Sequence, residues 1–198
     1  MSRAEMFISI DVETDGAAPG VNSMLALGAA AFAQDGSEVA TWYSTLYPLD
    51  GAAQNDETMQ WWAGQPEAWA EVSRDRRTPA KAIPAFVEWC EDLYREHRVK
   101  LIAVAWPAAF DFAFINYYCH RFAGRNPLGF ACLDIRSYAN GLARYQDYYG
   151  LPEKRVRAMA GEVDKTGLRE HVAVDDAIEQ GRLFMALRMA ALSSEGEQ

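Results

Sequence analysis

The chain has 198 residues, half of them hydrophobic, and a formal net charge of −9. This length suits one domain whose core needs no disulfide bonds, so we assign residues 1–192 to a single domain and expect 193–198 to be a disordered tail. No apolar run approaches the length of a membrane-spanning helix. Three cysteines without metal-type spacing, and the lack of a signal peptide, predict reduced thiols in the cytoplasm.

Negative charge is concentrated at the start of the chain, where residues 1–70 hold ten acidic residues and one basic residue. A protein that binds nucleic acid usually needs a basic surface. The rest of the chain is neutral and carries small clusters of arginine and lysine. This distribution of charge disfavours tight binding of long duplexes but is compatible with binding of short substrates.

The apolar segments and turn signals of the first half predict three strands followed by a short helix. The strands are expected at 7–12, 24–33 and 38–47, with a hairpin turn at 34–37. The polar stretch 56–58 contains residue types that cap the N-terminus of a helix, and the helix it would open contains Trp61 and Trp62. This half is therefore expected to be an antiparallel meander.

The second half alternates strands with helices, which predicts parallel pairing. Strands are expected at 101–105 and 130–133. Helices are expected at 78–97, 111–122, 134–144 with Asp134 as its cap, and 172–192, with a polar connection at 150–169. Together the two halves predict an α/β fold, a mixed five-stranded sheet with helices on both faces.

Acidic side chains end three of the apolar segments. Asp11 and Glu13 end the first strand, Asp111 opens the helix after the fourth, and Asp176 opens the last helix, five residues after His171. A carboxylate at the end of an apolar segment is costly unless a counter-charge compensates it, as a divalent cation does. The pattern therefore predicts one metal site.

Carboxylate oxygens suit hard cations such as Mg²⁺ or Mn²⁺ rather than Zn²⁺. Asp11 and Glu13 are two residues apart, so a strand directs both side chains to one face. Two such ions about 4 Å apart stabilise the attacking and leaving oxygens of a phosphodiester displacement. A nearby histidine can take the proton from the attacking water. We therefore predict two divalent cations as cofactors and His171 as the general base.

The acidic motifs follow one another in a particular order: Asp11-Val12-Glu13-Thr14, Phe110-Asp111, and His171-Val172-Ala173-Val174-Asp175-Asp176-Ala177. In this order they resemble the DEDDh branch of the DnaQ-like 3′-5′ exonuclease superfamily. The resemblance extends over about residues 6–187, and the third motif is its most specific part. A further stretch, 58–68 with its Trp-Trp pair, is similar to a small exoribonuclease group known from mycobacteria and phages, as is 133–137.

The resemblance implies a ribonuclease-H-like fold and 3′-5′ release of nucleoside 5′-monophosphates, with RNA favoured. It also implies that Asp11, Glu13, Asp111 and Asp176 bind the metal ions. At the third motif the residues alone leave open whether Asp175 or Asp176 is the ligand. If His171 lay within the helix, Asp175, four residues later, would share its helix face better than Asp176, five residues later. The family pattern counts five residues, with the histidine before the helix, so we choose Asp176 and interpret Asp175 as a first-turn acid favoured by the helix dipole.

The sequence departs from the family pattern at three places. Trp106-Pro107 stands where relatives often carry His-Asn, Ala17 replaces a larger hydrophobic residue after the first motif, and Ala26 stands where a Glu is often found. None of these is a proposed metal ligand. They concern the positioning of the substrate.

The candidate substrate contacts are Thr14, Met24, Leu25, Trp61 and Trp62. Tryptophans can stack on bases, but the seven-residue spacing of Trp62 and Trp69 is typical of core packing on a helix. For Met24 and Leu25, strand core is the simpler interpretation.

The expected partner is the 3′ end of single-stranded RNA or DNA. No association with a membrane is expected. A homodimer is a further possible assembly. The nearest alternative is the same chemistry on DNA, as in proofreading or repair, because recognition of the 2′-OH has no motif. A haloacid-dehalogenase-type phosphatase would need Asp at Glu13 and Thr at Asp15. The alternative of another class is a catalytically inactive nucleic-acid-binding or scaffold protein, against which the intact set of five residues argues.

Overall fold

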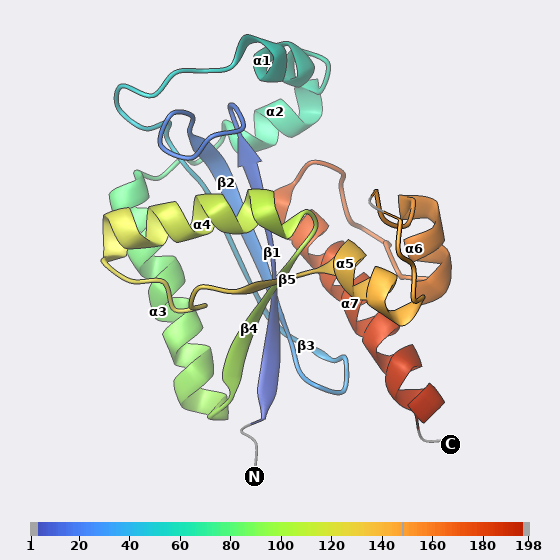
Figure 1. Ribbon diagram of the computed structural model, residues 1–198. Coiled ribbons are helices and arrows are strands. Elements are labelled where there is room, and N and C mark those ends of the chain that lie inside the picture. The colour runs from blue at the N-terminus through green and yellow to red at the C-terminus, as the bar shows by residue number, and fades with distance from the viewer. Residues whose placement is uncertain (1–3, 148, 196–198) are drawn as a thin grey trace.

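The computed structural model describes residues 4–147 and 149–195 (Figure 1). The strands are β1 (Glu5–Thr14), β2 (Met24–Phe32), β3 (Glu38–Thr45), β4 (Lys100–Ala105) and β5 (Cys132–Asp134). The helices are α1 (Asp56–Ala63), α2 (Pro66–Val72), α3 (Pro79–His97), α4 (Ala108–Ala123), α5 (Ile135–Leu142), α6 (Glu153–Ala160) and α7 (Ala173–Glu195).

The strands form one five-stranded sheet in the order β3-β2-β1-β4-β5. β1 pairs with β2, and β2 with β3, in antiparallel fashion, whereas β4 runs parallel to both β1 and β5. The prediction of a meander followed by parallel strands is confirmed. Because β1, β4 and β5 are parallel, their carboxyl ends meet at one edge of the sheet, where α4 and α5 begin.

Helices cover both faces of the sheet (Figure 1). On one face, α3 and α4 pack in a core that includes Ile8, Ile10 and Val12 of β1. On the other face, α5, α6 and α7 pack in a core that includes Phe7. Side chains alternate along a strand, so the odd-numbered acids at the end of β1 lie on the face that α7 covers.

A third, smaller core lies beyond the ends of β1 and β2, where α1 and α2 sit (Figure 1). It joins Leu25 and Ala26 of β2 to Trp62 of α1 and Ala173 of α7. The indole Nε1 of Trp62 also donates a hydrogen bond to the carbonyl of Thr14 at 2.9 Å. This core ties the helix pair to the acidic end of the sheet.

Asp134 holds the starts of two helices. Its Oδ1 accepts from the backbone N–H of Ser137 at 2.8 Å, which is the predicted N-cap of α5. Its Oδ2 accepts from the N–H of Ala108 at 3.1 Å, at the start of α4. A carboxylate suits both positions because helix N-termini offer free N–H groups. The side chain thereby fixes the start of α4, which carries Asp111, relative to β5.

Several predicted boundaries are wrong. α4 begins at Ala108, so Asp111 lies within its first turn and does not open it. The cap of α1 is Asn55, whose side chain accepts from the N–H of Thr58, and not the stretch 56–58. In both cases a residue just upstream of the expected one takes the terminal position, and the helical pattern itself is unchanged.

The last third of the chain is more helical than predicted. The polar connection 150–169 contains α6, whose single buried residue, Val156, gives too narrow an apolar stripe to be seen in the sequence. α7 continues to Glu195, so residues 193–195 of the expected disordered tail are helical, and 196–198 lie outside the described residues. Within the described ranges, no helix has both the length and the apolar character needed to cross a membrane.

Two glycines allow α7 to lie close to β2. A Cβ at Gly28 would lie 2.1 Å from the backbone carbon of Ala173, and one at Gly181 would lie 2.1 Å from the ring of Phe32. Gly28 is also the strand partner of Asp11. Gly28 therefore lets the start of α7 lie directly against the part of the sheet that carries Asp11, and Gly181 lets the middle of the helix pack on Phe32.

We predict that Gly28→Ala destabilises the protein by about 1–3 kcal/mol, the usual cost of overpacking, and also weakens divalent-cation binding. The added methyl would meet backbone atoms, which cannot rotate away, so α7 must shift. Thermal denaturation with and without Mn²⁺ measures both effects.

Gly141→Ala is the matched control, because nothing lies within 4 Å of a Cβ at that helical glycine. It should be neutral or slightly stabilising. A Gly28→Ala variant as stable as wild type, with an unchanged Mn²⁺ response, would contradict the importance of this contact.

Candidate active site

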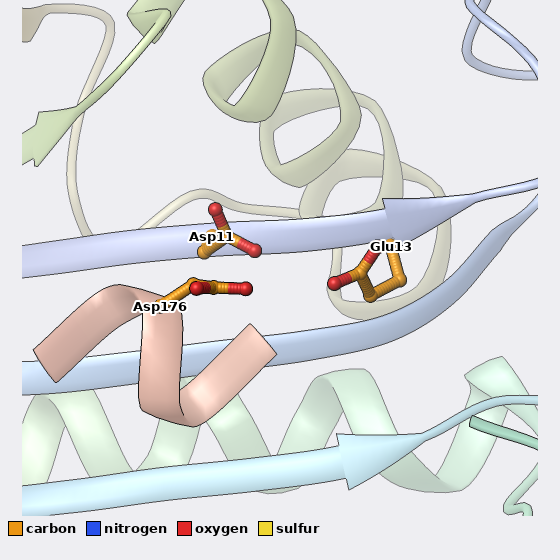
Figure 2. A group of neighbouring side chains, drawn as sticks. All are labelled: Asp11, Glu13 and Asp176. Carbon is orange, nitrogen blue, oxygen red and sulfur yellow. The ribbon is translucent and has the colours of Figure 1, made fainter. Parts of the chain in front are cut away.

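Carboxylates from β1 and α7 converge near the carboxyl end of β1 (Figure 2). One oxygen from each of Asp11, Glu13 and Asp176 lies within 4.8 Å of the others. Glu13 is buried, and Asp11 and Asp176 are partly exposed. The structure thus brings together three of the four predicted metal ligands, from positions far apart in the sequence.

Asp111, the fourth predicted ligand, lies outside this group of three but is close enough for its charge to act on Asp11. Its side chain is buried, and Oδ1 accepts from the N–H of Val12 at 3.3 Å. Its Oδ2 is buried without a hydrogen-bond partner. Buried polar atoms are rarely left unpaired, and a cation would satisfy this one.

Burial raises the pKa of all four carboxyls, and repulsion within the group raises it further for Asp11, Glu13 and Asp111. Burial, then the charges of Asp111, Glu13 and Asp176, raise the pKa of Asp11 well above its usual range. Burial, then repulsion from Asp176 and Asp111, raises the pKa of Glu13 to about 8. Burial raises the pKa of Asp111 to about 7 and that of Asp176 to about 6.

None of the ion pairs that lysine or arginine forms among the described residues reaches these four carboxylates. The cluster is therefore acidic and partly desolvated, and no lysine or arginine of the described residues pairs with it. Hard oxygen donors in this state fit Mg²⁺ or Mn²⁺.

Gln180 is a site residue that the sequence analysis missed. Its Nε2 donates to Oδ1 of Asp11 at 2.8 Å, and its Oε1 is buried without a partner. Gln180 lies four residues after Asp176, so both side chains project from one face of α7. That spacing was visible in the sequence, but a glutamine on a helix carries no signal of its own. The hydrogen bond orients the carboxylate of Asp11.

His171 lies just before α7, in the left-handed backbone conformation with φ of 60°. Its ring is 4.8 Å from the ring of Trp61, nearly perpendicular to it. Its charge lowers the pKa of Asp176, opposing the effect of burial, so the two groups are neighbours. Trp61 is 43% exposed. A histidine and an open indole face thus border the carboxylate cluster.

The two acids of the third motif have different surroundings. Asp176 lies with Asp11 and Glu13. The carboxylate of Asp175 instead accepts hydrogen bonds from the backbone N–H and the Nε of Arg169, at 3.2 and 2.8 Å. α7 begins at Ala173, so His171 precedes the helix, as the five-residue spacing requires.

The other candidate substrate contacts lie mostly in the core. Met24, Leu25, Trp62 and Thr14 are all buried. Trp62 contacts Trp69, with ring centres 5.5 Å apart, but the two belong to different helices and not to the one helix that was expected. Of these candidates, Trp61 alone is exposed.

The departures from the family pattern also have structural positions. Trp106 and Pro107 are joined by a cis peptide bond and lead into α4, for which Pro107 is the N-cap residue. Ala26 is buried and pairs with Glu13 across the sheet, in the core that contains Trp62. Ala17 is exposed after β1.

A groove of about 710 Å³ runs beside His171, between α2 and the segment that leads into α7. Its lining includes Glu67 and Glu71 of α2, and Arg169 and Glu170 of the opposite segment. Three of these four side chains are acidic, so the groove is poorly suited to phosphate groups unless cations are present.

Solved structures share this fold. The nuclease domain of 3′hExo, a DEDDh family member bound to rAMP, has a TM-score of 0.63 and 16% identity, covering 96% of this chain and 93% of that one. Pop2p of S. pombe, in a form with Mg²⁺ and Mn²⁺ bound, has a TM-score of 0.59 and 15% identity, covering 92% and 82%. The fold is that of the DEDDh exonucleases, so the predicted ribonuclease-H-like class is confirmed.

Two sequence comparisons identify the family. Residues 6–187 match the model of the 3′-5′ exoribonuclease Rv2179c-like domain. The 3′-5′ DNA exonuclease Cap18 of Escherichia coli is 30% identical over 180 residues, which cover 91% of this chain and 90% of that protein. The chain belongs to the Rv2179c-like family of 3′-5′ exonucleases, which confirms the resemblance found in the motifs.

The raised carboxyl pKa values predict how the stability of the metal-free protein depends on pH. Carboxyls have pKa values of about 4 in an unfolded chain, whereas Glu13 and Asp111 titrate near 8 and 7 in the fold. The folded state therefore binds more protons at these groups, and the stability that they contribute is full below about pH 4 and is lost as pH rises through these values. The melting temperature in EDTA should fall between pH 5 and 8.

Glu13→Gln should remove part of this fall and raise the stability of the metal-free protein at pH 8, by on the order of 1 kcal/mol or more. The control is Glu67→Gln, at an exposed position of α2, which should leave the pH dependence unchanged. A melting temperature that stays flat or rises between pH 5 and 8 would show that the cluster is not repulsive.

Proposed function

We propose that this protein is a metal-dependent 3′-5′ exonuclease that releases nucleoside 5′-monophosphates from single-stranded nucleic acid, with RNA favoured. The observation that carries the proposal is the convergence of Asp11, Glu13 and Asp176 beside His171. This arrangement has no structural purpose of its own, because it brings like charges together in a partly buried place.

In this proposal Asp11, Glu13, Asp111 and Asp176 hold two divalent cations, Mg²⁺ or Mn²⁺. Bound there, the ions would stabilise negative charge on the attacking and leaving oxygens of an in-line displacement at phosphorus. Gln180 keeps the carboxylate of Asp11 in position through its hydrogen bond.

His171 is proposed as the general base, which takes a proton from the attacking water at a ring nitrogen. Its place before α7, next to Asp176 but outside the carboxylate group, supports this role. Trp61, exposed and in contact with His171, is the best-placed aromatic group to stack on a base near the 3′ end.

DNA is the second candidate substrate. RNA is supported by the family description, which names an exoribonuclease. DNA is supported by the E. coli relative Cap18, which is a 3′-5′ DNA exonuclease.

We expect the purified protein with Mg²⁺ or Mn²⁺ to shorten 5′-labelled single strands stepwise from the 3′ end. EDTA or Asp11→Asn should abolish this, because each removes the ions or a ligand. Matched RNA and DNA strands of one sequence, followed on denaturing gels, measure activity and preference together.

The matched control is Asp35→Asn, in the exposed turn between β2 and β3. It should cleave like wild type. Full activity in EDTA or in Asp11→Asn would contradict metal-dependent catalysis, and faster cleavage of the DNA strand would favour the second candidate.

His171→Ala should lower turnover by roughly 10²–10⁴, the usual contribution of a positioned general base. Because the carboxylates remain, the thermal shift produced by Mn²⁺ should persist, and the rising limb of the pH–rate profile should be lost. If the variant instead lost its Mn²⁺ response, His171 would be a metal ligand and not a base.

A further inference from the structure

An arginine helps to hold the segment that presents His171. Arg169 lies two residues before His171, and its Nε donates to Oδ2 of Asp175 at 2.8 Å. Its backbone N–H donates to the same oxygen at 3.2 Å. The carboxylate of Asp175 thus closes a short loop around His171, from Arg169 on one side to the first turn of α7 on the other.

The same guanidinium reaches a second element. Its Nη1 lies 3.3 Å from Oε2 of Glu71 in α2, an oxygen that also accepts from Arg74 at 2.8 Å. The carboxylates of Asp175 and Glu71 are largely buried, with 12% and 14% of their side-chain surface exposed. We call these contacts of Arg169 with Asp175 and Glu71 the Arg169 bridge.

His171 needs such support because of its backbone. A φ of 60° places it in the left-handed region, which costs a residue with a Cβ on the order of 1 kcal/mol and persists only where the surroundings enforce it. On the helix side, the N–H groups of Asp175 and Asp176 bond to the carbonyl of Val172 at 2.8 and 3.0 Å. On the N-terminal side of His171, the Arg169 bridge fastens the chain to α7 and α2.

The exposure of the Arg169 side chain indicates that the bridge supports the loop around His171 without adding much to the stability of the fold. Arg169 keeps 56% of its side-chain surface exposed, and an ion pair with so exposed a partner contributes little to folding. Its value lies in geometry, since one planar guanidinium links α2, the loop and α7. Trp61 of α1 contacts the His171 ring as a further support.

We infer that the Arg169 bridge is a positioning device for the proposed general base. Arg169 and Asp175 do not touch the reacting atoms. They hold the loop so that the ring of His171 stays beside the carboxylate cluster. This inference rests on the proposed function, because it assumes that His171 takes part in proton transfer.

The test compares Arg169→Ala and Asp175→Ala with wild type on a labelled single-stranded oligonucleotide. Both variants should lower kcat about tenfold to a hundredfold, the cost of a misplaced catalytic group. KM, the Mn²⁺ concentration for half-maximal rate and the melting temperature should change no more than in the control. The double variant should be no slower than either single one, since the two residues act as one unit.

The control is Arg125→Ala, which removes a similarly exposed ion pair with Glu91, remote from the site. Arg169→Lys keeps a positive charge and should recover part of kcat. The decisive arm repeats Arg169→Ala in the His171→Ala background, where the loss of the bridge should cost less than about twofold because the group that it positions is gone.

Three results would overturn the inference: an unchanged kcat in Arg169→Ala, an equal loss in the His171→Ala background, or a raised Mn²⁺ requirement, which would mean that the bridge acts through Asp176. If His171→Ala were itself fully active, the proposed role of His171 would fail and the bridge with it. An inactive His171→Ala beside a fully active Arg169→Ala would overturn the bridge alone.

Discussion

The contact between α7 and β2 is the constraint on which the site depends. A helix normally rests on a sheet through its side chains, at a distance that would keep the carboxylates of Asp176 and Asp11 apart. Here Gly28 on the strand and Gly181 on the helix remove the intervening Cβ atoms. Because Gly28 is paired with Asp11, the point of closest approach lies beside the acidic end of β1. The small residues of β2 follow from the same need, since this strand is buried along its whole length.

The site is also a place where the fold stores unfavourable electrostatic energy. Buried carboxylates near one another are costly to ionise, and their raised pKa values reflect burial first and mutual repulsion second. Gln180 gives Asp11 one donor, and a backbone N–H gives Asp111 another, but among the described residues no lysine or arginine forms an ion pair with the group. Such a cluster is tolerated because the two cores on either side of the sheet are large and continuous, and because a bound cation would make the same groups favourable.

Apolar segments bounded by turn signals, the alternation of strands with helices and the order of the acidic motifs predicted the sheet, its mixed pairing and the three segments that carry the acids. These features depend on local sequence and on topology rules that few alternatives satisfy. The pattern did not separate Trp61 from Trp62, adjacent residues on one helix, because which of them is buried depends on where α1 docks. Nor did it indicate Gln180 or the partner of Asp175, since both interactions form only when α7 has its final position. α6 was missed because its apolar stripe is one residue wide.

The participants in the site come from opposite ends of the chain, and the hydrogen bond between Gln180 and Asp11 joins residues 169 positions apart. In any state in which β1 has formed but α7 has not yet docked, Asp11 and Glu13 lack the neighbouring side chains of Asp176 and Gln180. The proposed reactive centre is therefore created by the same long-range contact that completes the fold. A chain cut or stalled before the last helix would be inert as a nuclease, so the potential to destroy nucleic acid arises only in the finished molecule.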